Sequence, residues 1–279
     1  MKAREIMTAG TSPAGGSPVH PVACGFRAAA ARFEHGRPGY PAAAVNHLLD
    51  VLHITAGSTV VDLGAGTGKL TRALAPAGAR VIAVEPLPEM RRELLAAVSG
   101  VPVVGGMAEA LPLMPGSVNV LVAGQSWHWF DGARALLEAD RVLVPGGRLG
   151  LVWSAYDESV PWLGELVGIR ARRAIPGAPD HRTGAWRAAF EQGTRWRPLR
   201  QRDFRHTWTA SPEAVVDNVL STSFLALLPV QEQVTVEDEV RRLLGRHQRT
   251  GDRARVRLPL LTQVYSTSKR DTSSSADSR

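Results

Sequence analysis

Short apolar runs alternate with helix-like segments along the first 155 residues of the chain. The runs are rich in valine, which favours β-strands, whereas the segments between them space apolar residues at intervals of three and four, as amphipathic helices do. We expect strands at Thr59–Leu63, Arg80–Val84, Val101–Val104, Ser117–Gly124 and Arg148–Trp153, and helices at Phe26–Glu34, Ala42–Leu52, Lys69–Leu74, after Met90 to about Val98, and at Gly132–Val142. This alternation predicts an α/β fold.

The rest of the chain continues the series less regularly. Beyond Pro161 the pattern becomes helical and rich in arginine. A sixth strand, two helices and a final strand are expected at Phe204–Thr209, Pro212–Leu220, Val236–Arg249 and Val256–Tyr265. Because proline cannot donate to a β-ladder, we expect the final strand to start after Pro259.

Neither end of the chain shows such patterns. Residues 1–25 contain Gly, Pro, Ser and Thr without periodicity and are expected to be disordered. Residues 266–279 form a polar tail that we expect to be frayed. Residues 26–265 are therefore predicted to form the folded domain, with its core at about 57–154 and helical insertions at about 160–250.

The composition is that of a soluble globular protein, with 44% hydrophobic and 21% charged residues. No apolar run is long enough to span a bilayer, and no secretory signal is recognisable. Cys24 is the single cysteine, so no internal disulfide can form and a cytoplasmic location is expected. The net charge of +7 comes from scattered arginines rather than a basic stripe, which makes nucleic-acid binding unlikely without eliminating it.

A glycine-rich turn, Gly64-Ala65-Gly66-Thr67-Gly68, follows the first predicted strand and opens a helix. Glycines permit left-handed backbone angles and let a ligand lie against the main chain. The G-x-G-x-G spacing differs from the G-x-G-x-x-G of dinucleotide sites, and Asp62 just before it would repel a pyrophosphate but suit a cationic amino group. Glu85, at the end of the next strand, is placed to bind ribose hydroxyls. An amino group and a ribose without a phosphate describe S-adenosylmethionine.

The segment Val60–Leu70 resembles motif I of the class I S-adenosylmethionine-dependent methyltransferases, and Glu85 resembles the acid that follows that motif. The resemblance covers about residues 26–265. It implies a Rossmann-like sheet of seven strands with helices on both faces and the last strand antiparallel. It also implies methyl transfer that leaves S-adenosylhomocysteine and requires no metal.

A second segment narrows the resemblance. Phe33 followed by Arg37-Pro38-Gly39-Tyr40-Pro41 is similar to a signature of the methyltransferase type 11 group, which includes trans-aconitate-methyltransferase-like proteins. The resemblance implies that Arg37 meets the methionine carboxylate and that Tyr40 shields it. The alternative for Arg37 is that it caps the preceding helix.

Other cofactor contacts are implied in the same way. Leu87 and Met90 are candidates to contact the adenine ring, with core packing as the alternative, and the neighbouring Pro86 is a further candidate cofactor-binding residue. The Ala108 amide and the Glu109 carboxylate would meet the adenine edge, although Glu109 could instead be an acid at a helix start. Gln125 leaves the end of a central strand, where open α/β sheets bind ligands.

His128 is the candidate catalytic base, because it follows that strand and histidine titrates near neutral pH. Packing between Trp127 and Trp129 is the alternative, and an ionised carboxylate acceptor would need no base. Ser154 stands where the type 11 group often has Asn, which suggests a different acceptor. The prediction is methyl transfer to a small molecule, with an RNA-modifying enzyme or a catalytically silent cofactor-binding module as alternatives. A nicotinamide dehydrogenase is disfavoured by the glycine spacing and by Asp62.

Overall fold

The computed structural model describes residues 19–191, 195–247 and 255–270, which form a seven-stranded sheet in the order β3-β2-β1-β4-β5-β7-β6. The first five strands pair in parallel, and β7 is antiparallel to both of its neighbours. The strands are β1 (Thr59–Leu63), β2 (Arg80–Val84), β3 (Val103–Val104), β4 (Val118–Gly124), β5 (Leu143–Tyr156), β6 (Arg200–Ala210) and β7 (Val256–Ser268). The predicted Rossmann-like architecture is confirmed.

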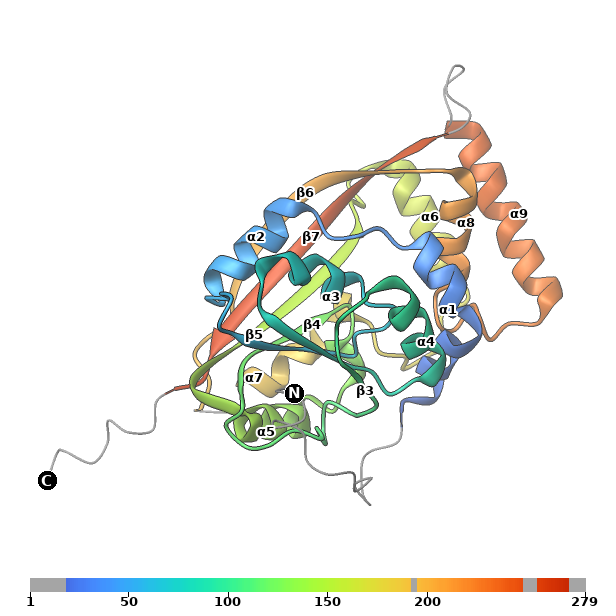
Figure 1. Cartoon of the computed structure of the whole chain (residues 1–279). Coiled ribbons are helices and arrows are strands. Elements are labelled where there is room, and N and C mark those ends of the chain that lie inside the picture. Colours follow the sequence, from blue (N-terminus) through green and yellow to red (C-terminus); the bar gives the residue numbers. More distant parts are fainter. Residues whose placement is uncertain (1–18, 192–194, 248–254, 271–279) are drawn as a thin grey trace, which may run out of the picture.

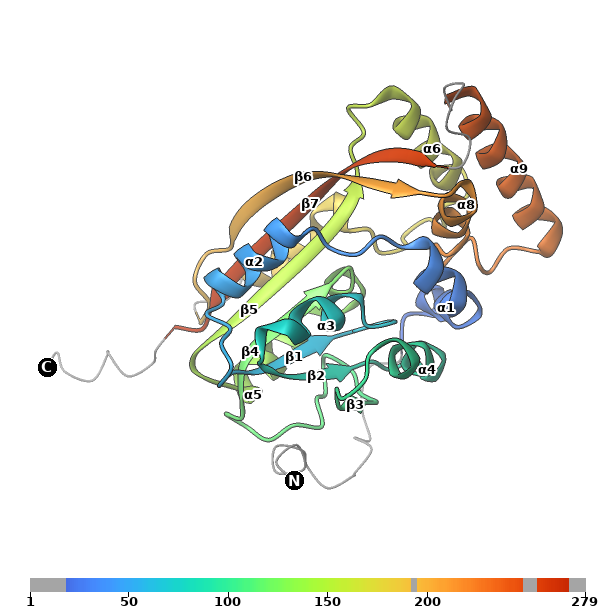
Figure 2. The same cartoon turned by 45° about the horizontal axis from the view of Figure 1, so that its top comes forward.

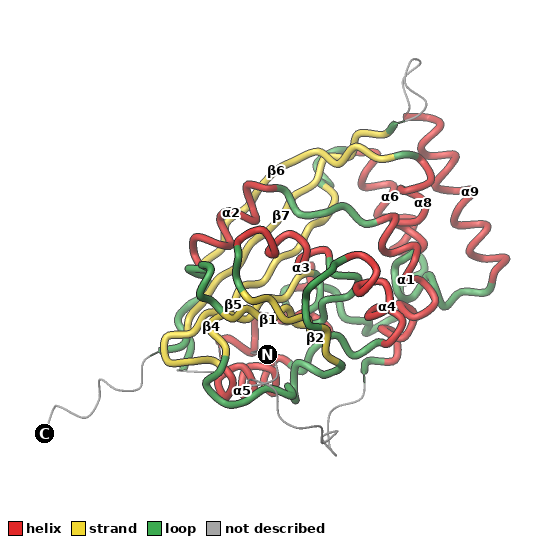
Figure 3. The backbone as a smooth tube through the Cα atoms, viewed as in Figure 1, coloured by secondary structure: helices red, strands yellow, loops and turns green. Residues whose placement is uncertain are grey.

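Helices cover both faces of the sheet (Figures 1 and 3). Alternate residues of the central strands face opposite layers: Val61 and Leu121 pack with α5, whereas Val60 and Val120 pack with α2 and α3. The helices are α1 (Gly25–Gly36), α2 (Ala42–Val51), α3 (Lys69–Leu74), α4 (Pro88–Ala97), α5 (Gly132–Val142), α6 (Pro161–Ala171), α7 (Ala188–Glu191), α8 (Pro212–Leu220) and α9 (Val230–His247). Within the described ranges, none is both long and apolar enough to cross a membrane.

The expected start of the final strand after Pro259 was wrong. β7 begins at Val256, and Pro259 lies opposite Thr207 of β6. The carbonyl of Pro259 accepts from the Asp157 N–H at 3.0 Å, just beyond the last β5–β7 pair, Tyr156 and Leu260. A strand residue's N–H and C=O point to the same side, so the missing donor faces the place where β5 ends, and the pairing of β7 with β6 continues through Pro259.

Several boundaries also differ from the sequence prediction. At the N-terminus, Pro21–Cys24 form a 3-10 helix and α1 starts at Gly25, so ordered structure begins before residue 26, while residues 1–18 lie outside the described part. At the other end, β7 continues to Ser268. The β5 strand begins at Leu143 rather than Arg148 and ends at Tyr156 rather than Trp153, with a register shift against β4. The prediction that α9 ends at Arg249 falls outside the described residues.

Helices α1, α6, α8 and α9 gather on one side of the molecule (Figure 2). Helix α1 packs on α8 and on α4, and α9 packs on α6 and α8. The α1–α8 contact is so close that a Cβ on Gly36 would lie 2.4 Å from the backbone nitrogen of Asn218. A Cβ on Gly25 would lie 1.9 Å from the carbonyl oxygen of Ser223. Glycine at these two positions therefore lets α1 approach the α8 backbone.

Replacing Gly36 with alanine is expected to lower the free energy of unfolding by about 1–3 kcal/mol, because the added methyl group overpacks the α1–α8 contact. Urea denaturation measures the change. Gly164→Ala in α6 is the matched control, since a Cβ there would meet nothing within 4 Å. This control should gain up to about 1 kcal/mol from helix propensity. A Gly36→Ala protein as stable as the native one would contradict the packing argument.

Candidate functional site

A cavity of about 330 Å³ lies at the carboxyl ends of β1, β2 and β4, beneath α1, α6 and α8. Most of the residues predicted from the sequence line it: Arg37, Tyr40, Gly64, Ala65, Gly66, Glu85, Pro86, Leu87, Met90, Gln125 and His128. Asp62, Gly68, Ala108 and Glu109 are not among its lining residues. The fold thus brings residues from distant parts of the chain to one site. The other four predicted residues do not line the cavity.

The three glycines of the turn have different tasks. All have positive φ, at 60°, 58° and 84° for Gly64, Gly66 and Gly68. A Cβ on Gly64 would lie 2.8 Å from the Cβ of Ser126, and one on Gly68 would lie 2.9 Å from Cγ of Leu94. At Gly66 a Cβ would meet no protein atom within 4 Å. Gly64 and Gly68 therefore serve packing, whereas Gly66 keeps its side of the cavity open for a ligand.

Glu85 joins the glycine turn to the loop after β2. Its two carboxylate oxygens accept hydrogen bonds from the backbone N–H groups of Gly66, at 2.9 Å, and Leu87, at 2.8 Å. Burial raises the pKa of this carboxyl group, while the two N–H groups act in the opposite direction. Each carboxylate oxygen can accept more than one hydrogen bond, so Glu85 can also bind two vicinal ribose hydroxyls.

One carboxylate oxygen of Asp62 accepts no hydrogen bond from the described residues. One of its oxygens accepts from the Thr71 hydroxyl at 2.6 Å, but the buried Oδ1 has no partner among the described residues. Burial raises the pKa of Asp62 to about 7, and repulsion from Glu85 acts in the same direction, while hydrogen bonding from Thr71 opposes the shift. A cationic amino group would supply the missing donor and favour the ionised form. Asp62 does not line the cavity, so its contact with an amino group stays a prediction, whereas Glu85 in the cavity wall has acceptor capacity that fits the ribose of S-adenosylmethionine.

Glu109 performs a structural task. Its Oε1 accepts from the backbone N–H of Asp131 at 2.8 Å, and Asp131 is the N-cap of α5. Burial raises the pKa of Glu109, and its Oε2 has no partner in the described part of the chain. The adenine contacts of Ala108 and Glu109 remain predictions.

Arg37 has the helix-capping role considered for it and also lines the cavity. Its backbone N–H caps α1 by donating to the carbonyl of Phe33 at 3.1 Å, while its side chain lines the cavity. There Nε donates to the Ser221 hydroxyl at 3.2 Å, and the guanidinium lies 4.9 Å from the centre of the Phe33 ring. Tyr40 lies over Gly124, where an added Cβ would come within 2.5 Å of its hydroxyl. Neither residue is thereby tied to the methionine end of a cofactor, and both assignments remain predictions.

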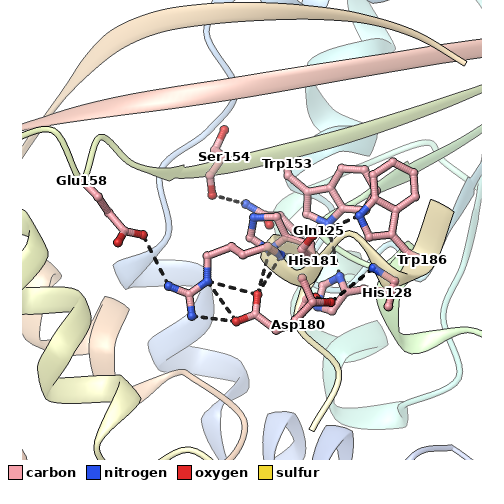
Figure 4. A network of polar contacts seen from close by, with 11 residues as sticks. Gln125, His128, Trp153, Ser154, Glu158, Asp180, His181 and Trp186 are labelled. Carbon is pink, nitrogen blue, oxygen red and sulfur yellow. Dashed lines mark hydrogen bonds and ion pairs between the residues drawn. The ribbon is translucent and has the colours of Figure 1, made fainter. Parts of the chain in front are cut away.

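His128 lies in the 3-10 helix Trp127–Trp129, in the wall of the cavity (Figure 4). The Trp153 indole N–H donates to its Nδ1 at 3.2 Å. Burial, and to a smaller extent the charge of nearby His181, lowers the pKa of His128 to about 3. Because an indole nitrogen can only donate, the lone pair of the neutral ring is at Nδ1 and its proton at Nε2. His128 is thus arranged to donate a hydrogen bond.

Further charged or titratable lining residues were missed from the sequence, among them Glu158, Arg170, Asp180, His181 and Arg182. The Arg182 guanidinium lies 2.6 Å from the Asp180 carboxylate and 3.4 Å from that of Glu158. The His181 ring stacks on Trp153, with 5.8 Å between the ring centres (Figure 4). The last four of these lining residues belong to an arginine-rich region without a motif, so no local signal marked them. Across the described ranges, no group of three or more His, Cys, Asp or Glu residues is arranged to hold a metal ion.

Known proteins are similar to this chain in sequence and in architecture. A sequence model of the family described as "Methyltransferase domain" matches residues 61–151. An uncharacterized methyltransferase of Mycobacterium tuberculosis is 38% identical over 247 residues, covering 85% of this chain and 92% of that protein. An uncharacterized methyltransferase-like protein of Schizosaccharomyces pombe is 33% identical over 248 residues, covering 88% and 95%.

A solved structure supports the fold. A protein of Anaeromyxobacter dehalogenans assigned as a type II methyltransferase superimposes with a TM-score of 0.59 at 24% identity, covering 84% of this chain and 97% of that one. Together with the extended sequence matches, this agreement shows that the chain belongs to the class I S-adenosylmethionine-dependent methyltransferases.

Proposed function

We propose that this protein transfers the methyl group of S-adenosylmethionine to a small-molecule acceptor held in the same cavity. The observation that carries the proposal is the continuity of that cavity. It extends from the glycine turn and Glu85 to Tyr156, Arg170 and Asn218 beneath α6 and α8. The bound cofactor supplies a methyl group already activated by the positive sulfur. The protein's task is then to orient the acceptor and exclude water.

The covering helices favour a small acceptor over RNA. Residues of α1, α6 and α8 line the cavity, and its volume is in the range typical of small-molecule sites. Of the two helices between β6 and β7, α8 lines the cavity through Asn218, whereas α9 contributes no lining residue in the described ranges. A cytoplasmic location and the absence of a metal requirement remain parts of the proposal.

A labelled-methyl transfer assay against a metabolite extract, with products identified by mass, tests the proposed activity. Incorporation into a small molecule supports it. Incorporation into RNA supports the RNA-modifying alternative instead. Cofactor binding without transfer to any extract component would favour a catalytically silent binding module.

Gly66→Ala should weaken binding of S-adenosylhomocysteine by about 1–3 kcal/mol, because its methyl group would occupy the open side of the cavity. Calorimetric titration measures the affinity. Gly116→Ala is the matched control: its φ of 59° is close to the 58° of Gly66, and its Cβ would also meet nothing within 4 Å. Both variants carry the same left-handed strain, but the control lies outside the cavity and should bind normally. Equal affinities for the two variants would refute the assigned role of Gly66.

His128 should remain neutral, with its proton on Nε2, throughout pH 5.5–8. Nitrogen NMR of histidine-labelled protein bound to S-adenosylhomocysteine reports both the tautomer and the titration, and His128→Gln assigns the resonance. The unfolded histidine takes up a proton near pH 6.5 and the folded one only near 3. Acidification between these values therefore favours unfolding, and His128→Gln should flatten that part of the stability curve. A His128 signal that titrates near pH 6.5 would restore the prediction of a catalytic base.

Binding to transfer RNA should be weak at physiological salt, because much of the basic surface is paired. Arg172 and Arg173 contact Glu239, and Arg241 contacts Glu237. A mobility-shift titration over a range of salt concentrations checks this. Micromolar affinity that falls steeply with salt would favour a nucleic-acid substrate.

A further inference from the structure

A guanidinium at the end of the cavity away from the glycine turn forms no ion pair with any residue that the structure describes. Arg170, on α6, lines the cavity beside Tyr156, and its Cζ lies 5.3 Å from the centre of the Tyr156 ring. The Tyr156 hydroxyl donates to Oδ1 of Asn218 at 2.7 Å, which holds the ring in place. Among the residues that the structure describes, the Arg170 guanidinium makes this ring contact but no hydrogen bond or ion pair.

The other cations around the cavity have protein partners. Arg182 pairs with Asp180 and Glu158, and Lys69 lies 3.3 Å from the Glu34 carboxylate. Arg37 uses Nε to bind the Ser221 hydroxyl. Arg170 is therefore the lining guanidinium whose hydrogen-bonding capacity the described protein leaves unused.

An unpaired buried charge is unfavourable unless a ligand compensates it. Burial lowers the pKa of Arg170, and the positive charge of Arg182 acts in the same direction, while Tyr156, Asp180 and Glu158 oppose the shift without forming an ion pair with Arg170. The pKa of Arg37 falls to about 10, mainly through burial and then through the repulsion of Arg170. An anion between Arg37 and Arg170 would relieve their mutual repulsion.

We propose that Arg170 binds an oxyanion of the acceptor, which identifies the acceptor as an organic acid with an apolar body. This proposal rests on the proposed function. A guanidinium presents a planar fork that matches a carboxylate in two parallel hydrogen bonds. The apolar body is indicated by the neighbouring lining residues Val167, Ala171, Ile175, Phe224 and Leu260.

The test uses the complex with S-adenosylhomocysteine and calorimetric titration. The probes are straight-chain and aryl carboxylic acids of about six to ten carbons, each paired with its primary amide, together with alkyl phosphates of the same length. Native protein should bind at least one acid and not its amide, and Arg170→Gln should weaken that binding by about tenfold or more. Arg172→Gln is the control: Arg172 lies at the end of the same helix, 61% exposed and paired with Glu239, and its loss should not alter acid binding.

Arg170→Lys keeps the charge without the fork and should bind acids with intermediate affinity, which provides a second variant if Arg170→Gln does not fold. An alkyl phosphate that binds through Arg170 more tightly than every acid would support the subsite with phosphate as the oxyanion. Equal binding of acids and amides, or no binding of any probe to the native complex, would overturn the proposal.

The cofactor has a carboxylate of its own, so its binding is measured separately. If Arg170→Gln weakens S-adenosylhomocysteine but not methylthioadenosine, which lacks the amino-acid end, Arg170 serves the cofactor and the acceptor subsite is refuted. If native protein does not bind S-adenosylhomocysteine at all, the proposed function fails. Normal cofactor binding without acid binding refutes the acceptor subsite alone.

Discussion

The Glu85 carboxylate holds together the two turns on which the cavity depends. By accepting the N–H groups of Gly66 and Leu87, it ties the loop after β1 to the loop after β2. Both loops leave the carboxyl ends of parallel strands, where backbone groups point out of the sheet without ladder partners. One buried carboxylate thus sets the width of the cofactor end and still has lone pairs for a ligand. This double use explains why the fold retains an acid whose burial is otherwise unfavourable.

The cover of the cavity depends on a different constraint, the contact between α1 and α8. Gly25 and Gly36 bring the α1 backbone against the segment from Asn218 to Ser223. Phe26 and Phe33 project from the same helix into the cavity wall, and Arg37 directly follows its end. Residues near the N-terminus are therefore positioned by residues some 190 positions later in the chain. The end of the cavity at the glycine turn belongs mainly to the parallel sheet, whereas the end at Arg170 depends on how the helices pack.

The environment of the cavity determines what its polar side chains can do. The Trp153 N–H occupies the lone pair of His128, which makes that histidine a donor. Asp180 and Glu158 neutralise Arg182, while Tyr156 orients Arg170 without neutralising it. Such an arrangement has little use for a general base if the acceptor is an anion, because an ionised carboxylate is already nucleophilic. The neutrality of His128 and the unpaired Arg170 are thus consistent with one kind of acceptor.

The sequence alone determined the α/β architecture, the glycine turn and the acids around it, because these features are local. Strand periodicity, left-handed glycines and an acid at a strand end each leave a pattern within a few residues. The sequence could not separate the task of Gly66 from those of Gly64 and Gly68, because the difference is whether a distant side chain fills the space. Nor could it single out Arg170 among many arginines, since its lack of an ion pair within the described residues depends on where distant carboxylates lie. Tertiary structure likewise decided that Pro259 fits inside β7 and that the His128 lone pair is occupied, because both follow from where β5 lies.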